Sequence, residues 1–185
     1  KEEQEILSKY IGWGGLQEAF DENNDSWSKE YSILKELLTD EEYVTARAST
    51  LTAFYTPPVV INAMYKALQN MGLKEANILE PSCGVGNFFG MLPNELENCK
   101  MYGVELDSIS GRIAQQLYQK NTIAVQGYEK VDLPDSFFDV AVGNVPFGDF
   151  KVIDKRYDRN KFLIHDYFFG KTLDKVRPRR NSCFY

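Results

Sequence analysis

The sequence has few cysteines, a single histidine and no long hydrophobic run. Cys83, Cys99 and Cys183 show no metal-binding spacing, and we expect them to be reduced. No stretch is apolar for long enough to cross a bilayer, and we expect no secretory signal. The histidine, His165, is interpreted as a helix-start or core residue rather than a catalytic one. These absences predict a cytoplasmic protein with no membrane span and no bound metal ion.

The sequence also lacks an initiator methionine. It begins with a helical pattern and stops abruptly. We therefore expect a piece of a longer protein. Its 185 residues suit one domain with a small accessory part. We predict a helical region over residues 1–50 and a core domain over residues 51–185.

Positive charge is scarce over most of the chain. The formal net charge is −6, but residues 1–150 hold 11 basic and 23 acidic residues, whereas residues 151–185 hold 10 and 4. An acidic chain argues against nucleic-acid binding over its whole surface. The basic C-terminal segment has two interpretations, a solvated tail or a surface that contacts phosphates beside a binding site.

A strand, a glycine turn and a helix are predicted in succession over residues 76–90. The apolar start of this stretch ends at Glu80 and breaks at Pro81. Gly84 and Gly86 then lead into an apolar stretch typical of a helix start. This arrangement brings a nucleotide-like ligand close to bare backbone, where a Cβ atom would collide with it.

The spacing and the acid distinguish this turn from a dinucleotide-binding loop. The glycines at 84, 86 and 90 follow Gly-x-Gly-x-x-x-Gly, and Glu80 would repel a pyrophosphate. A ligand with a sulfonium or an ammonium group would instead be attracted to this carboxylate. The pattern therefore points to S-adenosylmethionine. The residues of this stretch expected to bind it are Glu80, Pro81, Gly84, Gly86 and Asn87.

Alternating strands and helices follow the glycine turn, as in a doubly wound, mostly parallel α/β sheet. We predict strands over residues 101–104, 123–125 and 138–142, and helices over 108–119 and 166–176. The last strand is apolar throughout, as expected of a parallel strand buried on both faces. The residues of the last helix expected to face the core are Tyr167, Phe168, Leu173 and Val176.

The tips of two predicted strands carry candidate ligands for an adenosine. Glu105 ends a strand about twenty residues after the glycine turn, the usual place for a carboxylate that binds ribose hydroxyls. This role requires an acid that stays ionised. Leu106 is expected to pack on the adenine ring, and Tyr128, after the following strand, to lie near the edge of the adenine.

Residues 54–57, Phe-Tyr-Thr-Pro, precede an amphipathic helix. Thr56 is placed to cap this helix, whose free N–H groups suit a carboxylate. Phe54 and Tyr55 offer an aromatic surface. The stretch is either a simple helix cap or a second cofactor-binding element, and its position just before the glycine turn favours the second interpretation.

The first fifty residues are expected to pack against the core. Helical spacing over residues 1–20 is interrupted by Ile-Gly-Trp-Gly-Gly at 11–15, which predicts a turn around a packed Trp13. Thr39 and the acids after it predict a helix cap and first turn. A lid over a cofactor is the alternative to simple packing.

The strand predicted over residues 138–142 leads into Asn144, Val145, Pro146 and Phe147, which suit methylation of an amine conjugated to a ring. Such an amine is a poor nucleophile because its lone pair is delocalised, so it needs two hydrogen-bond acceptors and a fixed orientation. The Asn144 side chain and the Val145 main chain each offer a carbonyl group. Phe147 offers a flat surface for a base lifted out of a duplex. The alternative is a tight turn that closes the strand.

As a set, these motifs resemble the S-adenosylmethionine-dependent amino-methyltransferases, specifically the gamma group of DNA adenine-N6 methyltransferases. Residues 80–88 resemble motif I, Glu105 the motif II acid, residues 144–147 the Asn-Pro-Pro-aromatic motif, and residues 54–57 motif X. Residues 10–15 are similar to methylase–helicase proteins of bacterial mobile elements. The resemblance implies a truncated Rossmann-like class I methyltransferase core. It also implies double-stranded DNA with a flipped adenine as substrate, and further target-recognition and helicase domains in the parent protein.

Two residues depart from the family pattern. Val145 replaces the first proline, although the acceptor there is a main-chain carbonyl. Gly127 replaces an acid that binds the cofactor adenine in the family, and Glu129 is a candidate substitute. The absence of a Pro-Cys pair argues against C5-cytosine methylation. The alternatives that stay open are methylation of protein glutamine or RNA guanine, and a non-catalytic binding module.

Overall fold

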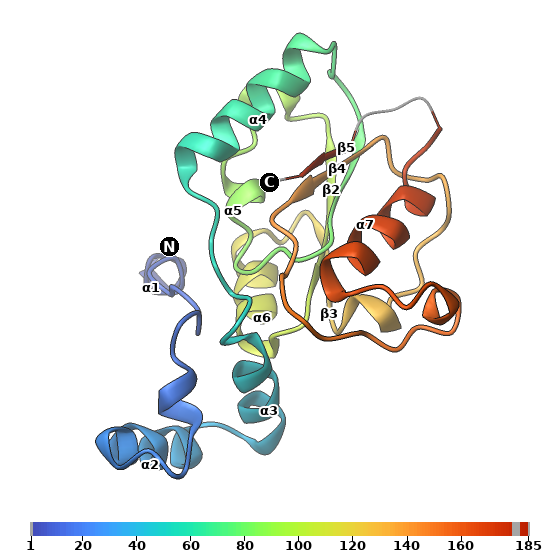
Figure 1. The fold of residues 1–185 in the computed structure, drawn as a ribbon. Helices are drawn as coiled ribbons and strands as arrows, with labels where there is room; N and C mark the ends of the chain where they lie inside the picture. The colour runs from blue at the N-terminus through green and yellow to red at the C-terminus, as the bar shows by residue number, and fades with distance from the viewer. Residues whose placement is uncertain (1, 179–181, 185) are drawn as a thin grey trace.

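The computed structural model of the chain describes residues 2–178 and 182–184. Its centre is a five-stranded parallel sheet with strand order β3-β2-β1-β4-β5 (Figure 1). The strands are β1 (Asn77–Glu80), β2 (Lys100–Glu105), β3 (Thr122–Val125), β4 (Val140–Gly143) and β5 (Ser182–Phe184). The sequence predicted no strand beyond Pro178, and β5, which pairs with β4, corrects that expectation.

Helices cover both faces of the sheet. They are α4 (Pro58–Asn70), α5 (Asn87–Gly90) and α6 (Ser108–Leu117) on one face and α7 (Ile164–Lys175) on the other (Figure 1). Because side chains alternate along a strand, Ile78 of β1 joins the core under α4 to α6, whereas Leu79 joins the opposite core. Single-turn 3₁₀ helices occupy Gln17–Phe20, Asp25–Trp27, Asn94–Leu96, Tyr128–Lys130 and Asp158–Asn160.

The N-terminal region packs around its own small aromatic cluster. It contains α1 (Glu2–Leu7), α2 (Ser28–Leu37) and α3 (Asp40–Ser49). Trp13 packs edge-to-face on Phe20, with ring centroids 5.6 Å apart, and the predicted capping box forms between Thr39 and Glu42. The predicted turn around a packed Trp13 is confirmed, although the first helix already ends at Leu7 and the turn has positive φ angles at Gly12 and Gly15.

The N-terminal region is docked on α6 through polar contacts. The Arg112 guanidinium pairs with Glu42 of α3, and the hydroxyl groups of Thr45 and Ser108 lie 3.3 Å apart. Gln4 of α1 donates to the main-chain oxygen of Gln116 at 3.3 Å. These contacts bring the end of α3 to the carboxyl edge of the sheet.

Two details of the helices differ from the prediction. Thr56 is buried and does not cap α4; the N-cap is Pro57, which has no side-chain acceptor. In α7, Leu173 is 62% exposed, whereas Lys171 and Thr172 are buried. The prediction for Leu173 is wrong because Lys171 finds buried partners, which a hydropathy pattern cannot indicate.

The order of the strands along the chain reverses between β1 and β4, which makes this the topological switch point of the sheet. The chain moves outward from β1 to β2 and β3 on one side, and from β4 to β5 on the other. In open α/β sheets a crevice forms at the carboxyl ends of the strands at this point. Within the described residues, no helix is long and apolar enough to cross a membrane, and no cluster of histidine, cysteine and acidic residues could hold a metal ion.

Candidate active site

A pocket of about 340 Å³ lies at the carboxyl ends of the strands, at the switch point. Most of the predicted site residues line it: Phe54, Tyr55, Thr56, Glu80, Pro81, Gly84, Asn87, Glu105, Leu106, Tyr128, Asn144 and Pro146. Gly86, Val145 and Phe147 were also predicted but do not line it. Residues 48, 49 and 52, at and just beyond the end of α3, also contribute to the lining.

The glycine turn packs directly against an aromatic ring. Gly84 has a positive φ of +54°, and a Cβ atom there would lie 2.5 Å from Cε1 of Tyr55. Gly86 also has a positive φ, +85°, but its neighbour is Tyr118, beneath the turn. The absence of a side chain at Gly84 therefore allows the Tyr55 ring to pack on the turn. At Gly86 glycine allows the positive φ angle and the close packing of Tyr118.

Glu105 is held by the main chain on both sides. Its Oε2 accepts a hydrogen bond from Gly84 N at 2.7 Å, and its Oε1 accepts one from Asp107 N at 2.8 Å. Burial is the largest influence and raises the pKa of Glu105 to about 7, despite these hydrogen bonds. The prediction of a fully ionised acid therefore needs correction: near pH 7 this carboxyl group is divided between its two protonation states.

Glu80 is a deeply buried acid of the pocket. It is 3% exposed, and its Oε2 has no hydrogen-bond partner among the described residues. Burial, assisted by the nearby Glu105, raises the pKa of Glu80 well above its usual value. A cationic ligand beside Glu80 would favour the charged form again, so the residue suits a sulfonium or ammonium group.

Asn144 follows β4 and is fixed by two contacts. Its Nδ2 donates to the main-chain oxygen of Phe54 at 3.0 Å, and the Ser82 hydroxyl donates to the Asn144 main-chain oxygen at 2.7 Å. The side-chain oxygen accepts no hydrogen bond from the described residues. Asn144 therefore joins the 54–57 stretch to the glycine turn and still presents a carbonyl oxygen.

The neighbours of Asn144 differ in exposure. Val145 is 1% exposed and packs in the core under α7. Phe147 is 58% exposed, and its ring stacks on His165, with centroids 5.6 Å apart and planes 23° apart. One surface of the Phe147 ring is therefore covered by the second residue of α7, and only the remainder is accessible to a base.

After β3, the side chain of Glu129 occupies the space that a side chain at Gly127 would need. A Cβ atom at Gly127 would lie 2.3 Å from Oε1 of Glu129, so the Glu129 carboxylate stands where a side chain at 127 would be. Both residues line the pocket. The departure at Gly127 therefore leaves an acid in this part of the pocket, supplied from two residues further on.

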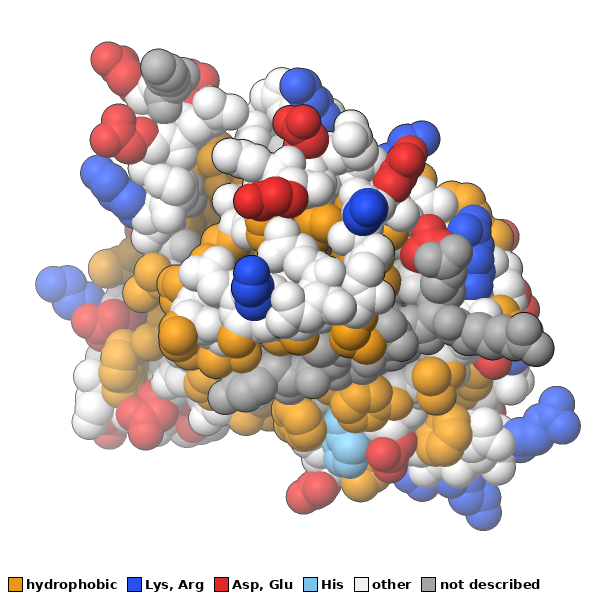
Figure 2. All heavy atoms as spheres, turned by 90° about the horizontal axis from the view of Figure 1, so that it is seen from above, with side chains coloured by type: hydrophobic (Ala, Val, Ile, Leu, Met, Phe, Trp, Pro, Cys, Tyr) orange, Lys and Arg blue, Asp and Glu red, His pale blue; other side chains and the backbone are white. Residues whose placement is uncertain are grey.

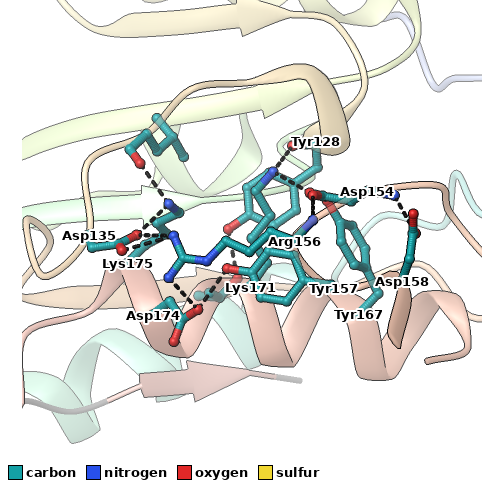
Figure 3. A network of polar contacts seen from close by, with 12 residues as sticks. Tyr128, Asp135, Asp154, Arg156, Tyr157, Asp158, Tyr167, Lys171, Asp174 and Lys175 are labelled. Atoms are coloured by element: carbon teal, nitrogen blue, oxygen red, sulfur yellow. Dashed lines mark hydrogen bonds and ion pairs between the residues drawn. The ribbon is translucent and has the colours of Figure 1, made fainter. Parts of the chain in front are cut away.

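Tyr128 is tied to α7 through a buried polar network (Figure 3). Its hydroxyl group lies 3.0 Å from that of Thr172, and its main-chain oxygen accepts from Lys171 Nζ at 2.7 Å. Lys171 also pairs with Asp154 at 3.0 Å. Since Tyr128 is 3% exposed, only a small part of it can reach a ligand.

The basic side chains of the C-terminal segment are of two kinds, those that form ion pairs and those that do not. Ion pairs inside the protein hold Arg156, Lys171, Lys175 and Arg177. The remaining described cations of this segment are exposed and have no side-chain polar partner among the described residues: Lys151, Lys155, Arg159 and Lys161. Arg179 and Arg180 lie outside the described residues. On the face shown in Figure 2, basic and acidic side chains are interspersed among exposed hydrophobic ones.

Sequence reasoning missed the role of Asp107 and Ser110. Asp107 is 1% exposed, lines the pocket and caps α6, with its Oδ2 accepting from Ser110 N at 3.0 Å. Its Oδ1 has no partner among the described residues. The signal for the cap was present, because an aspartate three residues before a serine opened the predicted helix. Nothing local indicated that Asp107 also faces the pocket.

Two proteins are similar in sequence. Defense against restriction protein B of Escherichia phage P1 is 32% identical over 139 residues, which are 72% of this chain and 6% of that protein. Type II methyltransferase M.CvrRI of Paramecium bursaria Chlorella virus XZ-6E is 33% identical over 94 residues, which are 51% of this chain and 24% of that protein. The chain thus spans less than a quarter of either relative. No protein-family model matches it.

Solved structures share the fold. A protein from Vibrio vulnificus YJ016, described as a modification subunit of a type I restriction enzyme, covers 85% of this chain, with 37% of its own length, a TM-score of 0.53 and 20% identity. A protein from Methanococcus maripaludis, described as an S-adenosyl-L-methionine-dependent methyltransferase, covers 86%, with 62% of its own length, a TM-score of 0.50 and 10% identity. The chain has the Rossmann-like class I methyltransferase fold, and the predicted fold class is confirmed.

Proposed function

We propose that the chain is the S-adenosylmethionine-binding core of a DNA methyltransferase that modifies the N6 amine of adenine. The observation that carries the proposal is the position of Asn144. It lies at the pocket after β4, its side-chain oxygen accepts no hydrogen bond from the described residues, and it is fixed by Phe54 and Ser82. A carbonyl oxygen so fixed suits the hydrogen atoms of a conjugated amine.

The lining of the pocket suits the proposed cofactor. When bound, S-adenosylmethionine supplies an activated methyl group. We expect Glu105 to accept hydrogen bonds from the ribose hydroxyl groups and the unpartnered oxygen of Glu80 to lie near a positively charged group. Glu129 is the proposed acceptor for the amine of the adenine. Gly84 lines the pocket, and its lack of a side chain allows Tyr55 to pack against the turn there.

DNA is the proposed substrate for two reasons. First, the names of two similar proteins concern restriction or a type II methyltransferase, and a structural neighbour is described as a modification subunit. Second, exposed Lys151, Lys155, Arg159 and Lys161 follow shortly after the half-exposed ring of Phe147. Cations beside an aromatic surface suit a nucleic-acid backbone and an unstacked base. Target recognition and any helicase function belong, in this proposal, to other domains of the parent protein.

Calorimetric titration with S-adenosylmethionine tests the cofactor site. We expect micromolar binding, and Glu105→Ala is expected to weaken it at least about tenfold, or 1.4 kcal/mol. Glu97→Ala, an exposed acid outside the pocket, is the matched control and should bind like the wild type. No binding by the wild-type chain would contradict the proposal. Methylation of a glutamine-bearing peptide or of RNA guanine, with DNA left unmodified, would replace DNA as the substrate.

The affinity for S-adenosylmethionine is expected to rise with pH. Because the pKa of Glu105 is about 7, a proton occupies an oxygen that the ribose needs below that pH. Between pH 6 and pH 8 the affinity should increase about tenfold and then level off. The groups that face Glu105 are Asp107, Glu80, Tyr10 and Tyr55, and the tyrosine pKa values are raised by burial, which keeps both phenols neutral throughout this range.

A Glu105→Gln variant separates Glu105 from its neighbours in this titration. Because glutamine cannot ionise, the affinity of this variant for S-adenosylmethionine should change less with pH. Any remaining change is attributed to the titration of Glu80. Binding that strengthens as the pH falls from 8 to 6 would contradict the assignment of Glu105 as an ionised acceptor.

A further inference from the structure

The glycine-rich segment at residues 12–15 runs alongside the stretch at residues 50–55. Gly15 N donates to the main-chain oxygen of Thr50 at 2.9 Å. A Cβ atom at Gly14 would lie 2.1 Å from the main-chain oxygen of Ala53, and one at Gly12 would lie 2.8 Å from the Tyr55 hydroxyl. The segment therefore follows its neighbour at distances that side chains at 12 and 14 would prevent.

Tyr55 lies between two glycines of different segments. Gly12 faces the hydroxyl group and the Cε2 edge of the ring, whereas Gly84 of the glycine turn faces the Cε1 edge, where a Cβ atom would lie 2.5 Å away. A ring held on opposite edges has little freedom to move aside. The N-terminal segment thus determines where Tyr55 stands in the pocket.

Polar atoms without partners gather at this end of the pocket. Within the described residues, the hydroxyl groups of Tyr10 and Tyr55 and the Oδ1 of Asp107 are buried and make no hydrogen bond of good geometry, although Ser110 is near enough to interact with both phenols. Tyr10 and Tyr55 both interact electrostatically with Asp107 and Glu105. Asp107 is 1% exposed and lines the pocket. Since buried polar groups are nearly always satisfied, the Tyr55 hydroxyl and the Asp107 Oδ1, whose residues line the pocket, indicate a polar ligand group beside them.

Trp13 connects this cluster to the N-terminal region. Its ring packs edge-to-face on Tyr10, with centroids 6.0 Å apart, and on Phe20, which belongs to the small N-terminal core. Tyr10 is therefore held in place by the fold of the first fifty residues rather than by the sheet.

We infer that residues 10–15 lie behind the wall of the cofactor pocket and hold Tyr55 against the glycine turn, and that Tyr55 and Asp107 bind a hydroxyl or ammonium group of the ligand. The inference rests on the proposed function, because S-adenosylmethionine is the ligand that carries such groups. It assigns a positioning role to a segment whose glycines otherwise serve only packing. Tyr55 is a contact residue in this scheme, and Gly12 is a positioning residue.

Two glycine substitutions in the same segment provide a matched test. Gly12 and Gly15 both have positive φ angles, +76° and +80°, so alanine strains the backbone at either position. A Cβ atom at Gly12 meets Tyr55, whereas one at Gly15 meets no atom within 4 Å. Calorimetry with S-adenosylmethionine should show affinity reduced at least about tenfold for Gly12→Ala and less than about twofold for Gly15→Ala. Thermal unfolding should shift similarly in both variants.

A second pair of variants tests the hydroxyl group itself. Tyr55→Phe removes only the oxygen and is expected to weaken binding about fivefold, the effect of one hydrogen bond. Tyr31→Phe, in the N-terminal cluster away from the pocket, should bind like the wild type. This inference is overturned, and the proposed function stands, if the wild type binds, Gly12→Ala and Gly15→Ala bind equally well, and Tyr55→Phe binds like the wild type. Absence of wild-type binding would overturn both.

Discussion

Methyl transfer to DNA by an Asn144→Ala variant is expected to be roughly 10²- to 10³-fold slower than by the wild type, the usual cost of removing one polar group that stabilises a transition state. The amine becomes positively charged as it attacks the sulfonium methyl group, so an acceptor on its hydrogens is needed most at that moment. Alanine removes this acceptor. It also removes the donor to the main-chain oxygen of Phe54, which lies 3.0 Å from Nδ2.

A comparison with Asn87→Ala distinguishes chemistry from binding. Asn87 lines the same pocket at the start of α5, beside the glycine turn, and we predict a cofactor contact there. Its replacement should weaken S-adenosylmethionine binding with little change in the rate at saturating cofactor. The rates are measured by transfer of a labelled methyl group to unmethylated duplex DNA, with the protein in its natural length. Equal rates for Asn144→Ala and wild type at saturation would show that Asn144 is structural.

A Lys171→Met variant is expected to lose about 3–5 kcal/mol of unfolding free energy, because one member of a buried ion pair is left without its partner. The Lys171 side chain is 6% exposed and that of Asp154 is 12% exposed, and the two lie 3.0 Å apart (Figure 3). Burial tends to raise the pKa of Asp154, but the Tyr167 hydroxyl and Lys171 together hold it below its usual value. Asp154 is therefore charged at neutral pH and would remain buried without a counterion.

Lys175→Met is the control for this prediction. Lys175 is equally buried and lies 2.6 Å from Asp135, but Asp135 is 47% exposed and also pairs with Arg156. Water and Arg156 can compensate Asp135, so the loss should be about 1–2 kcal/mol. Urea unfolding followed by circular dichroism measures both variants. Equal losses of unfolding free energy in the two variants would contradict the prediction that the exposure of the partner carboxylate determines the destabilisation.

The central motif could be predicted from the sequence because its determinants are local. A short apolar run, an acid and two glycines within ten residues specify the strand and the turn at Glu80 to Gly86, and the structure has them where the pattern placed them. The fold class followed from the alternation of such units. Glu105 was recognised in the same way, from its distance along the chain.

Features that depend on distant partners could not be predicted. Burial of Lys171 requires Asp154 and Tyr128, and neither is near it in sequence. The stacking of Phe147 on His165 joins the end of β4 to the start of α7. Thr56 failed as a cap because two prolines follow it and place Pro57 at the N-cap. The raised pKa of Glu105 arises from burial, which composition and spacing do not reveal.

The pair formed by Gly127 and Glu129 constrains how this site can vary among homologues. Since the Glu129 carboxylate occupies the space of a side chain at 127, an acid at 127 and the present conformation of Glu129 exclude one another. Substitutions at the two positions are therefore coupled: a homologue with aspartate at the first should carry a different residue, or an outward rotamer, at the third. Each arrangement gives this part of the pocket one acidic side chain, either at position 127 or at position 129. Exchanging both residues at once would convert one arrangement into the other.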